Sequence, residues 1–141
     1  MQDIDPPAGY TRLTPKSQFI RDLGLAIFER RTDRTKRHMR VLTDSAHGNS
    51  DGFLHGGFLL ALADFALSYG TFEEGDRAPA ITLNLGVNFM RAAKPGQWLD
   101  LEIDTRKESG TILFADCTIA HEGKVIAHAS GVFRPVRPPE S

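Results

Sequence analysis

Cysteine is almost absent from this sequence, in which Cys117 is the only thiol among 141 residues. A single cysteine excludes an intramolecular disulfide and a zinc cluster built from several cysteines, and it suits a reducing compartment. An excess of one charge is also missing, because 17 Lys and Arg residues stand against 18 Asp and Glu residues without a long basic run. This charge balance disfavours binding to nucleic acid.

A long hydrophobic run is missing as well. The first 12 residues, MQDIDPPAGYTR, are acidic and contain prolines, with none of the apolar segment that is typical of a secretory signal. The most apolar stretch, residues 56–70, is shorter than the roughly 20 residues that cross a bilayer. We therefore expect a cytoplasmic protein without membrane contact, and a chain of this length fits one globular domain.

Residues 56–70, GGFLLALADFALSYG, predict the central element of the fold. Their only polar groups are the side chains of Asp64 and Ser68 and the hydroxyl of Tyr69, and a helix that is apolar all round is normally covered by other structure. A buried, unpaired carboxylate is costly, so Asp64 is the best single candidate for a functional residue. The competing interpretation is a buried aspartate that backbone amides or an arginine satisfy.

Residues 1–24 are expected to form an N-terminal arm and a short helix. Two prolines and a glycine oppose regular structure within residues 1–14. A helix is then predicted over residues 15–23, with Thr14 as its N-cap and Gly24 immediately after its end.

Six strands account for most of the remaining chain. They are predicted over residues 25–31 and 36–43 before the central helix, and over residues 81–89, 99–104, 111–120 and 124–134 after it. Strict alternation in the third strand places one set of side chains on a buried face: Ile81, Leu83, Leu85, Val87 and Phe89. Thr82 then points to the opposite face.

Turns and loops connect these elements. They are expected at residues 32–34, 44–54, 73–79, 95–96, 109–110 and 122–123, followed by a proline-rich tail over residues 136–141. Four consecutive strands joined by tight turns predict an antiparallel meander whose inner face the central helix covers. The expected fold class is therefore α+β, with a curved antiparallel sheet wrapped around one long helix.

A resemblance to a known family lies in the loop that leads into this helix. The run from Asn49 to Gly57, NSDGFLHGG, followed by Asp64, resembles the signature of hotdog-fold acyl-CoA thioesterases of the phenylacetyl-CoA thioesterase (PaaI-like) type. An Asn six residues before the His and an Asp nine residues after it make the match more specific than His-Gly-Gly alone. The run ITLNLGVNFMRAAKPGQWL resembles the family's post-helix strand and proline turn. The resemblance covers about residues 25–135, which we take as the thioesterase domain.

The resemblance implies hydrolysis of acyl-CoA thioesters, a reaction in which negative charge develops on the carbonyl oxygen. Gly56 would lie at the helix N-terminus, where unpaired backbone N–H groups and the positive end of the helix dipole converge. It is therefore the expected oxyanion contact, and its lack of a Cβ allows a substrate to approach closely. By the same resemblance Asn49 approaches the thioester and His55 shapes the loop. Taken alone, Asn49 is a turn former and His55 a structural residue at a helix start.

Asp64 follows Gly56 by eight residues, or roughly 12 Å along one helix, so one chain cannot bring the two together. The resemblance implies a homodimer or homotetramer in which two central helices lie antiparallel, with Asp64 of one subunit near Gly56 of the other. There Asp64 would act as a general base on water or as a nucleophile that forms a mixed anhydride, and both roles stay open. Thr82 matches a position where the family holds the water or the aspartate, although an ordinary strand residue is an equal alternative.

The substrate contacts are expected near the helix start and at the end of the post-helix strand. An acyl pocket needs apolar side chains, and the phosphates of coenzyme A need basic ones. The expected substrate-binding residues are Phe53, Leu54, Gly57, Phe58, Phe89, Arg91 and Lys94. They suit an aromatic or medium-chain acyl group, while its identity and the choice between coenzyme A and a carrier protein stay open.

Other chemistries fit the sequence less well. His47, Asp51 and His55 recur every four residues, but the glycines and asparagine between them disfavour the helix that a metal site would need. No metal or cofactor is therefore predicted, and no G-x-S-x-G motif indicates a serine hydrolase. Two alternatives remain: a hotdog hydratase or dehydratase that acts on acyl thioesters, and a non-catalytic acyl-CoA-binding protein.

Overall fold

The structure is a computed structural model that describes residues 3–31, 36–70, 80–109 and 111–136. The predicted turn at residues 32–34, the loop at residues 73–79, Gly110 of the next turn and most of the tail lie outside these residues. Within the described ranges, no helix has both the length and the hydropathy of a membrane span.

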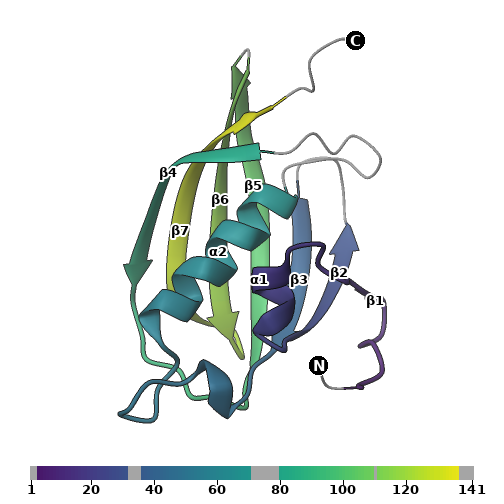
Figure 1. The fold of residues 1–141 in the computed structure, drawn as a ribbon, viewed down its shortest axis with the longest axis vertical. Helices are drawn as coiled ribbons and strands as arrows, with labels where there is room; N and C mark the ends of the chain where they lie inside the picture. Colours follow the sequence, from purple (N-terminus) through teal and green to yellow (C-terminus); the bar gives the residue numbers. More distant parts are fainter. Residues whose placement is uncertain (1–2, 32–35, 71–79, 110, 137–141) are drawn as a thin grey trace.

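A seven-stranded antiparallel sheet curves around one long helix, α2 (Gly56–Gly70), as Figure 1 shows. The strands are β1 (Thr11–Arg12), β2 (Ala26–Arg31), β3 (Lys36–Leu42), β4 (Ala80–Phe89), β5 (Trp98–Ser109), β6 (Ile112–His121) and β7 (Lys124–Pro135). The short elements are the helix α1 (Gln18–Asp22) and the 3-10 turn η1 (Ser45–His47). The predicted α+β hotdog architecture is confirmed, and α2 has the predicted bounds.

Within the described residues, the sheet covers one side of α2. A stripe at helical spacing packs on the sheet, and its members are Leu59, Leu62, Ala63, Ala66 and Leu67. On the opposite side Leu60 is 37% exposed and Asp64 is half-buried. The expectation of a helix covered on every side, with a buried carboxylate, is therefore wrong for a single chain, because the strands all lie against one face.

The strand order also corrects the predicted meander. The sheet runs β1-β2-β3-β5-β6-β7-β4, so β4 pairs with β7 at an edge while β5 pairs with β3. The segment between β4 and β5 is a crossover and not a hairpin: Ala93 O accepts the Leu54 N–H, and Thr43 Oγ1 accepts the Gly96 N–H. These contacts hold the crossover that carries the chain from one end of the sheet to β5. Among the described strands, β4 pairs only with β7.

The three remaining strands after the helix do form the predicted meander. Glu122 and Gly123 both have positive φ, at 48° and 80°, as a two-residue hairpin turn between β6 and β7 requires. The inward side chains of this meander are mainly aliphatic, and they meet the covered side of α2.

The N-terminal segment differs in detail from its expectation. Thr11 and Arg12 extend the sheet as β1, because Leu13 N–H bonds to Ile27 O and holds the arm along β2. The helix α1 begins later than predicted, with Ser17 and not Thr14 as N-cap, since the Ser17 hydroxyl accepts the Ile20 N–H.

The C-terminal end of α2 is held by a residue that the sequence reasoning missed. Arg37 is buried on the inner face of β3, and its guanidinium donates to Tyr69 O over 3.0 Å. A cation at the carbonyl end of a helix is favourable, because the last carbonyls are unpaired and carry the negative end of the dipole. In the alternating pattern of β3, Arg37 lies on the same face as the buried residues Met39 and Val41. This alternation could have placed Arg37 on the inner face from the sequence.

Candidate active site

The loop before α2 is fixed by the side chain of Asn49. Its Oδ1 accepts two backbone N–H groups, from Asp51 at 2.9 Å and from Phe53 at 3.0 Å. The backbone of Asn49 also donates to Phe53 O over 2.7 Å. Asn49 is therefore a turn former, and because its oxygen is used inside the loop, its Nδ2 donor is the group left for other partners.

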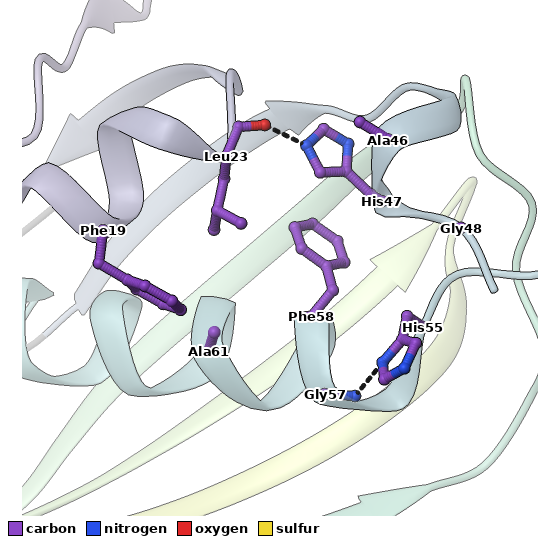
Figure 2. A pocket seen from close by; sticks show the side chains of 9 residues that line it. All are labelled: Phe19, Leu23, Ala46, His47, Gly48, His55, Gly57, Phe58 and Ala61. Carbon is purple, nitrogen blue, oxygen red and sulfur yellow. Dashed lines mark hydrogen bonds between the residues drawn. The ribbon is translucent and has the colours of Figure 1, made fainter.

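The first turn of α2 is capped by His55. The Nδ1 atom of this residue accepts the Gly57 N–H over 2.8 Å, as Figure 2 shows, and His55 O accepts the Leu59 N–H. An acceptor Nδ1 means that the ring proton is on Nε2. His55 thus orients the helix start, and Nδ1 is not available as a base.

Gly56 retains a free amide at this helix start. No acceptor for its N–H is found among the described residues, whereas the next amide, that of Gly57, is occupied by His55. A Cβ at position 56 would lie 3.7 Å from Phe89 Cζ, in ordinary contact. The glycine therefore leaves open the space in front of an unpaired donor at the positive end of the helix dipole.

Asn49 and Gly56 line the same cavity of about 480 Å³. Four predicted substrate contacts line it too: Phe53, Leu54, Phe89 and Arg91. The remaining lining residues are Leu59, Met90, Ala92 and Ala93. The structure thus brings together two hydrogen-bond donors, apolar side chains and one cation. We refer to this space as the Asn49 cavity.

A second cavity, of about 280 Å³, lies at the helix start between α2, η1 and α1 (Figure 2). Its lining includes the predicted residues His55, Gly57 and Phe58, together with Phe19, Leu23, Ala46, His47, Gly48 and Ala61. We refer to it as the α1 cavity, because α1 and the residue that follows it form one wall. The predicted contact Lys94 lines neither cavity, and its backbone N–H donates to Gln97 Oε1 in the turn before β5.

The buried side chain of His47 joins three segments around the α1 cavity. Its Nδ1 accepts the Asp44 N–H over 2.9 Å, so its Nε2 carries the proton and donates to Leu23 O over 2.5 Å. The ring stacks on Phe58 at 4.6 Å, and His47 O accepts the His55 N–H. Sequence reasoning considered His47 only as a metal ligand and missed this structural role. Among the described residues no group of three or more metal-ligating side chains occurs.

Asp64 and Thr82 meet because of a β-bulge. Thr82 pairs with Phe133 and Asn84 with Val132, so Leu83 is an extra residue in β4. Residues that pair across two strands share a face, and Phe133 belongs to the core. Thr82 therefore faces α2, against the strict alternation that was predicted, and its hydroxyl donates to Asp64 Oδ1 over 2.7 Å.

The predicted buried face of β4 is likewise only partly present. Leu85 and Val87 pack on the core, but several large apolar side chains on β4 and after it are exposed: Ile81 at 46%, Leu83 at 48%, Phe89 at 53% and Met90 at 59%. Ile81 pairs with the exposed Arg134 and so lies on the face opposite to Thr82. We refer to the other three residues, together with Leu60 of α2, as the β4 surface.

Cys117 is not part of this site. It points into the core from β6, and burial, with smaller contributions from Asp116 and Glu102, raises the pKa of its thiol to about 12. A thiol that keeps its proton at neutral pH is a poor nucleophile.

Comparison with known proteins places these features in context. A sequence profile described as the thioesterase superfamily matches residues 51–127. The Pseudomonas aeruginosa protein PA0474, an esterase by name, is 30% identical over 131 residues, which are 92% of this chain and 97% of that protein.

Solved structures share the fold. The E. coli PaaI protein from the phenylacetic acid degradation operon matches with a TM-score of 0.73 and 20% identity over 86% of each chain. A thioesterase protein of Streptococcus pneumoniae TIGR4, crystallised with coenzyme A, matches with a TM-score of 0.70 and 17% identity over 81% of this chain and 91% of that chain.

Proposed function

Because the chain belongs to the thioesterase superfamily, we propose that it hydrolyses acyl-CoA thioesters to the free acid and coenzyme A, at sites formed between two copies of the chain. The observation that carries the proposal is the unpaired Gly56 N–H beside Asn49 in the Asn49 cavity. The pneumococcal neighbour with coenzyme A supports this class of substrate.

The first role is polarisation of the thioester carbonyl. Its oxygen accepts the Gly56 N–H and the Nδ2–H of Asn49, which are held by the helix start and by the loop. These donors are in place before the reaction, so they stabilise the developing oxyanion without reorganisation, and each is worth about 3 kcal/mol in a site without bulk water. His55 contributes by holding the neighbouring Gly57 amide, which leaves the Gly56 amide for the substrate.

The second role belongs to Asp64 of the partner subunit. As general base it takes a proton from water while the water oxygen attacks the carbonyl carbon, and collapse of the tetrahedral intermediate expels the coenzyme A thiolate. As nucleophile its carboxylate forms a mixed anhydride, again with the thiolate as leaving group, which water then hydrolyses. In either role the Thr82 hydroxyl holds Oδ1 and leaves Oδ2 for the reaction.

The β4 surface supports the dimer. Large apolar side chains that are exposed on a single chain are suited to burial at an interface, and among the described strands β4 pairs only with β7, so a second β4 can extend its other edge. A two-fold axis beside α2 would place two central helices antiparallel, because an isologous interface uses the same surface on both copies. Asp64 of each copy then reaches the helix start of the other.

Release of free thiol from a panel of acyl-CoAs tests the function. We expect steady turnover by the native protein and a loss of at least 100-fold in kcat for Asp64→Asn, since general acid–base groups contribute about 10²–10⁴-fold. Asn keeps the size of the side chain and accepts the Thr82 hydroxyl, so circular dichroism and oligomeric mass should match the native protein. Equal turnover by both proteins would discard the mechanism. Tight binding of acyl-CoA without turnover would instead favour a binding protein.

A further inference from the structure

The α1 cavity is apolar although two histidines line it. His47 directs both ring nitrogens away, to Asp44 N–H and Leu23 O, and presents its ring face to Phe58. His55 uses Nδ1 on the Gly57 amide. Leu23, Ala61 and Phe58 supply carbon surface, and Figure 2 shows the Phe19 ring between α1 and α2 beside them. The cavity therefore suits a hydrocarbon group and offers little to a phosphate.

The two cavities flank consecutive residues at the helix start. Gly56 lines the Asn49 cavity and Gly57 lines the α1 cavity. A thioester whose oxygen lies on the Gly56 N–H has two arms that leave the carbonyl carbon in different directions, so each arm can enter one cavity. Arg91 belongs to the Asn49 cavity and attracts the phosphates of coenzyme A. The coenzyme A part of the substrate then lies in the Asn49 cavity, and the acyl part lies in the α1 cavity.

We propose that the α1 cavity binds the acyl group and that Phe19 sets the acyl length which the enzyme prefers; this inference rests on the proposed thioesterase function. Phe19 is 63% exposed, although α1 is anchored beside it by buried Ile20 and by the His47 bond to Leu23 O. A large aromatic ring at the open edge of an apolar cavity gains burial when a chain reaches it. A volume of about 280 Å³ is at the lower end for ligand sites, so the cavity holds the acyl arm and not the whole substrate.

The test is kcat/KM for acetyl-, butanoyl-, hexanoyl-, octanoyl- and phenylacetyl-CoA in three proteins: native, Phe19→Ala and Phe53→Ala. In the native enzyme kcat/KM should rise about fourfold with each added methylene until the chain reaches Phe19. Phe19→Ala should leave acetyl-CoA unchanged, because a two-carbon group does not reach α1, and should lower octanoyl-CoA about tenfold. Phe53→Ala removes a matched exposed ring from the Asn49 cavity and should affect every acyl length equally.

Binding of an alkyl-CoA thioether series separates the two hypotheses. A thioether cannot be hydrolysed, so its affinity reports the acyl site independently of catalysis. A loss in Phe19→Ala that is confined to the longer chains, by turnover or by binding, supports the acyl site. Normal hydrolysis with a length profile that depends on Phe53 and not on Phe19 overturns it while the thioesterase function stands. No hydrolysis, with thioether binding that Phe19→Ala weakens for the longer chains only, keeps the acyl site and rejects the hydrolytic function.

Discussion

Thr82 donates its hydroxyl to Asp64 Oδ1 over 2.7 Å and thereby joins the edge strand β4 to the uncovered side of α2. Their contact exists because the bulge at Leu83 turns Thr82 toward the helix. The hydrogen bond fixes one oxygen of the Asp64 carboxylate. We propose that this carboxylate either takes a proton from water or attacks the thioester.

Replacement of Thr82 by Val should slow catalysis without unfolding the protein. The shape is kept but the hydroxyl is lost, and a hydrogen bond to a charged group is worth about 1.5 kcal/mol, or roughly tenfold. We expect kcat to fall by about that factor with KM little changed, because Thr82 holds the carboxylate and not the substrate. Thr82→Ser should retain most of the native kcat. A valine variant with native kcat would assign Thr82 a purely structural role.

Replacement of Gly56 by Ala should separate activity from stability. The φ of Gly56 is not positive, and a Cβ there would make ordinary contact with Phe89, so the folded state accepts alanine. The free energy of unfolding should therefore be unchanged or higher by about 0.4–1 kcal/mol. The added methyl group occupies the space in front of the proposed oxyanion donor, so kcat/KM should fall about 100-fold. Urea unfolding and thiol release measure the two effects.

The neighbouring glycine is the control for this experiment. A Cβ on Gly57 would lie 3.0 Å from the His55 ring, so Gly57→Ala should displace the cap and lower the free energy of unfolding by about 1 kcal/mol. If Gly56→Ala were as unstable as Gly57→Ala, its loss of activity would say nothing about the oxyanion contact.

Mixing of two inactive variants tests whether the site is shared between subunits. In a mixed dimer of Asp64→Asn and Gly56→Ala chains, one of the two sites combines native Gly56 with native Asp64 of the partner subunit. Random mixing should therefore restore about a quarter of the native activity per site. Refolding the two proteins together and assaying thiol release measures this, with each variant refolded alone as reference. Absence of any recovery, with mixed dimers present by mass, would show that Asp64 and Gly56 of different subunits do not act in one shared site.

Cys117 should not react with thiol reagents in the folded protein. Burial raises the pKa of its thiol from 9.0 to about 12, so at pH 8 the native thiol is protonated and enclosed. An aromatic disulfide reagent should release no chromophore until urea unfolds the chain, and then one equivalent, since this is the only cysteine. Rapid reaction in the native state would mean that the core around β6 opens readily.

The raised pKa of Cys117 also makes the free energy of unfolding depend on pH. Between pH 9.0 and about 12 the unfolded chain loses this proton while the folded chain keeps it. The contribution of Cys117 to the free energy of unfolding is therefore complete below pH 9.0 and is lost as the pH rises toward 12. A Cys117→Ala variant should lack this part of the alkaline decline, measured by urea unfolding at several pH values.

His47 should be important for stability. A His47→Leu variant leaves the Asp44 N–H and Leu23 O without their partner, and each unsatisfied buried group costs about 1–3 kcal/mol. We expect the urea midpoint to fall strongly. His128→Leu is a suitable control. Among the described residues, the side chain of that half-buried histidine has a polar contact only with Thr118, at 3.4 Å, so the effect should stay within about 0.5 kcal/mol.

The sequence by itself determined the elements with strong local patterns. The apolar run that forms α2, the turn at Glu122–Gly123 and the loop from Asn49 to Gly57 were all predictable, because helix periodicity, turn chemistry and capping act between residues close in the chain. The sequence also indicated that Asp64 and Gly56 cannot meet on one helix, since the rise per residue fixes their separation.

Only the tertiary structure decided where these elements meet. The pairing of β4 with β7, the bulge that turns Thr82 toward Asp64, and the enclosure of the α1 cavity by Phe19 and His47 all depend on contacts between segments far apart in the chain. Strand partners and bulges are set by which surfaces can be buried together, and alternation along one strand does not encode this choice. For that reason the candidate residues were predictable singly, but their division between two cavities and one open surface was not.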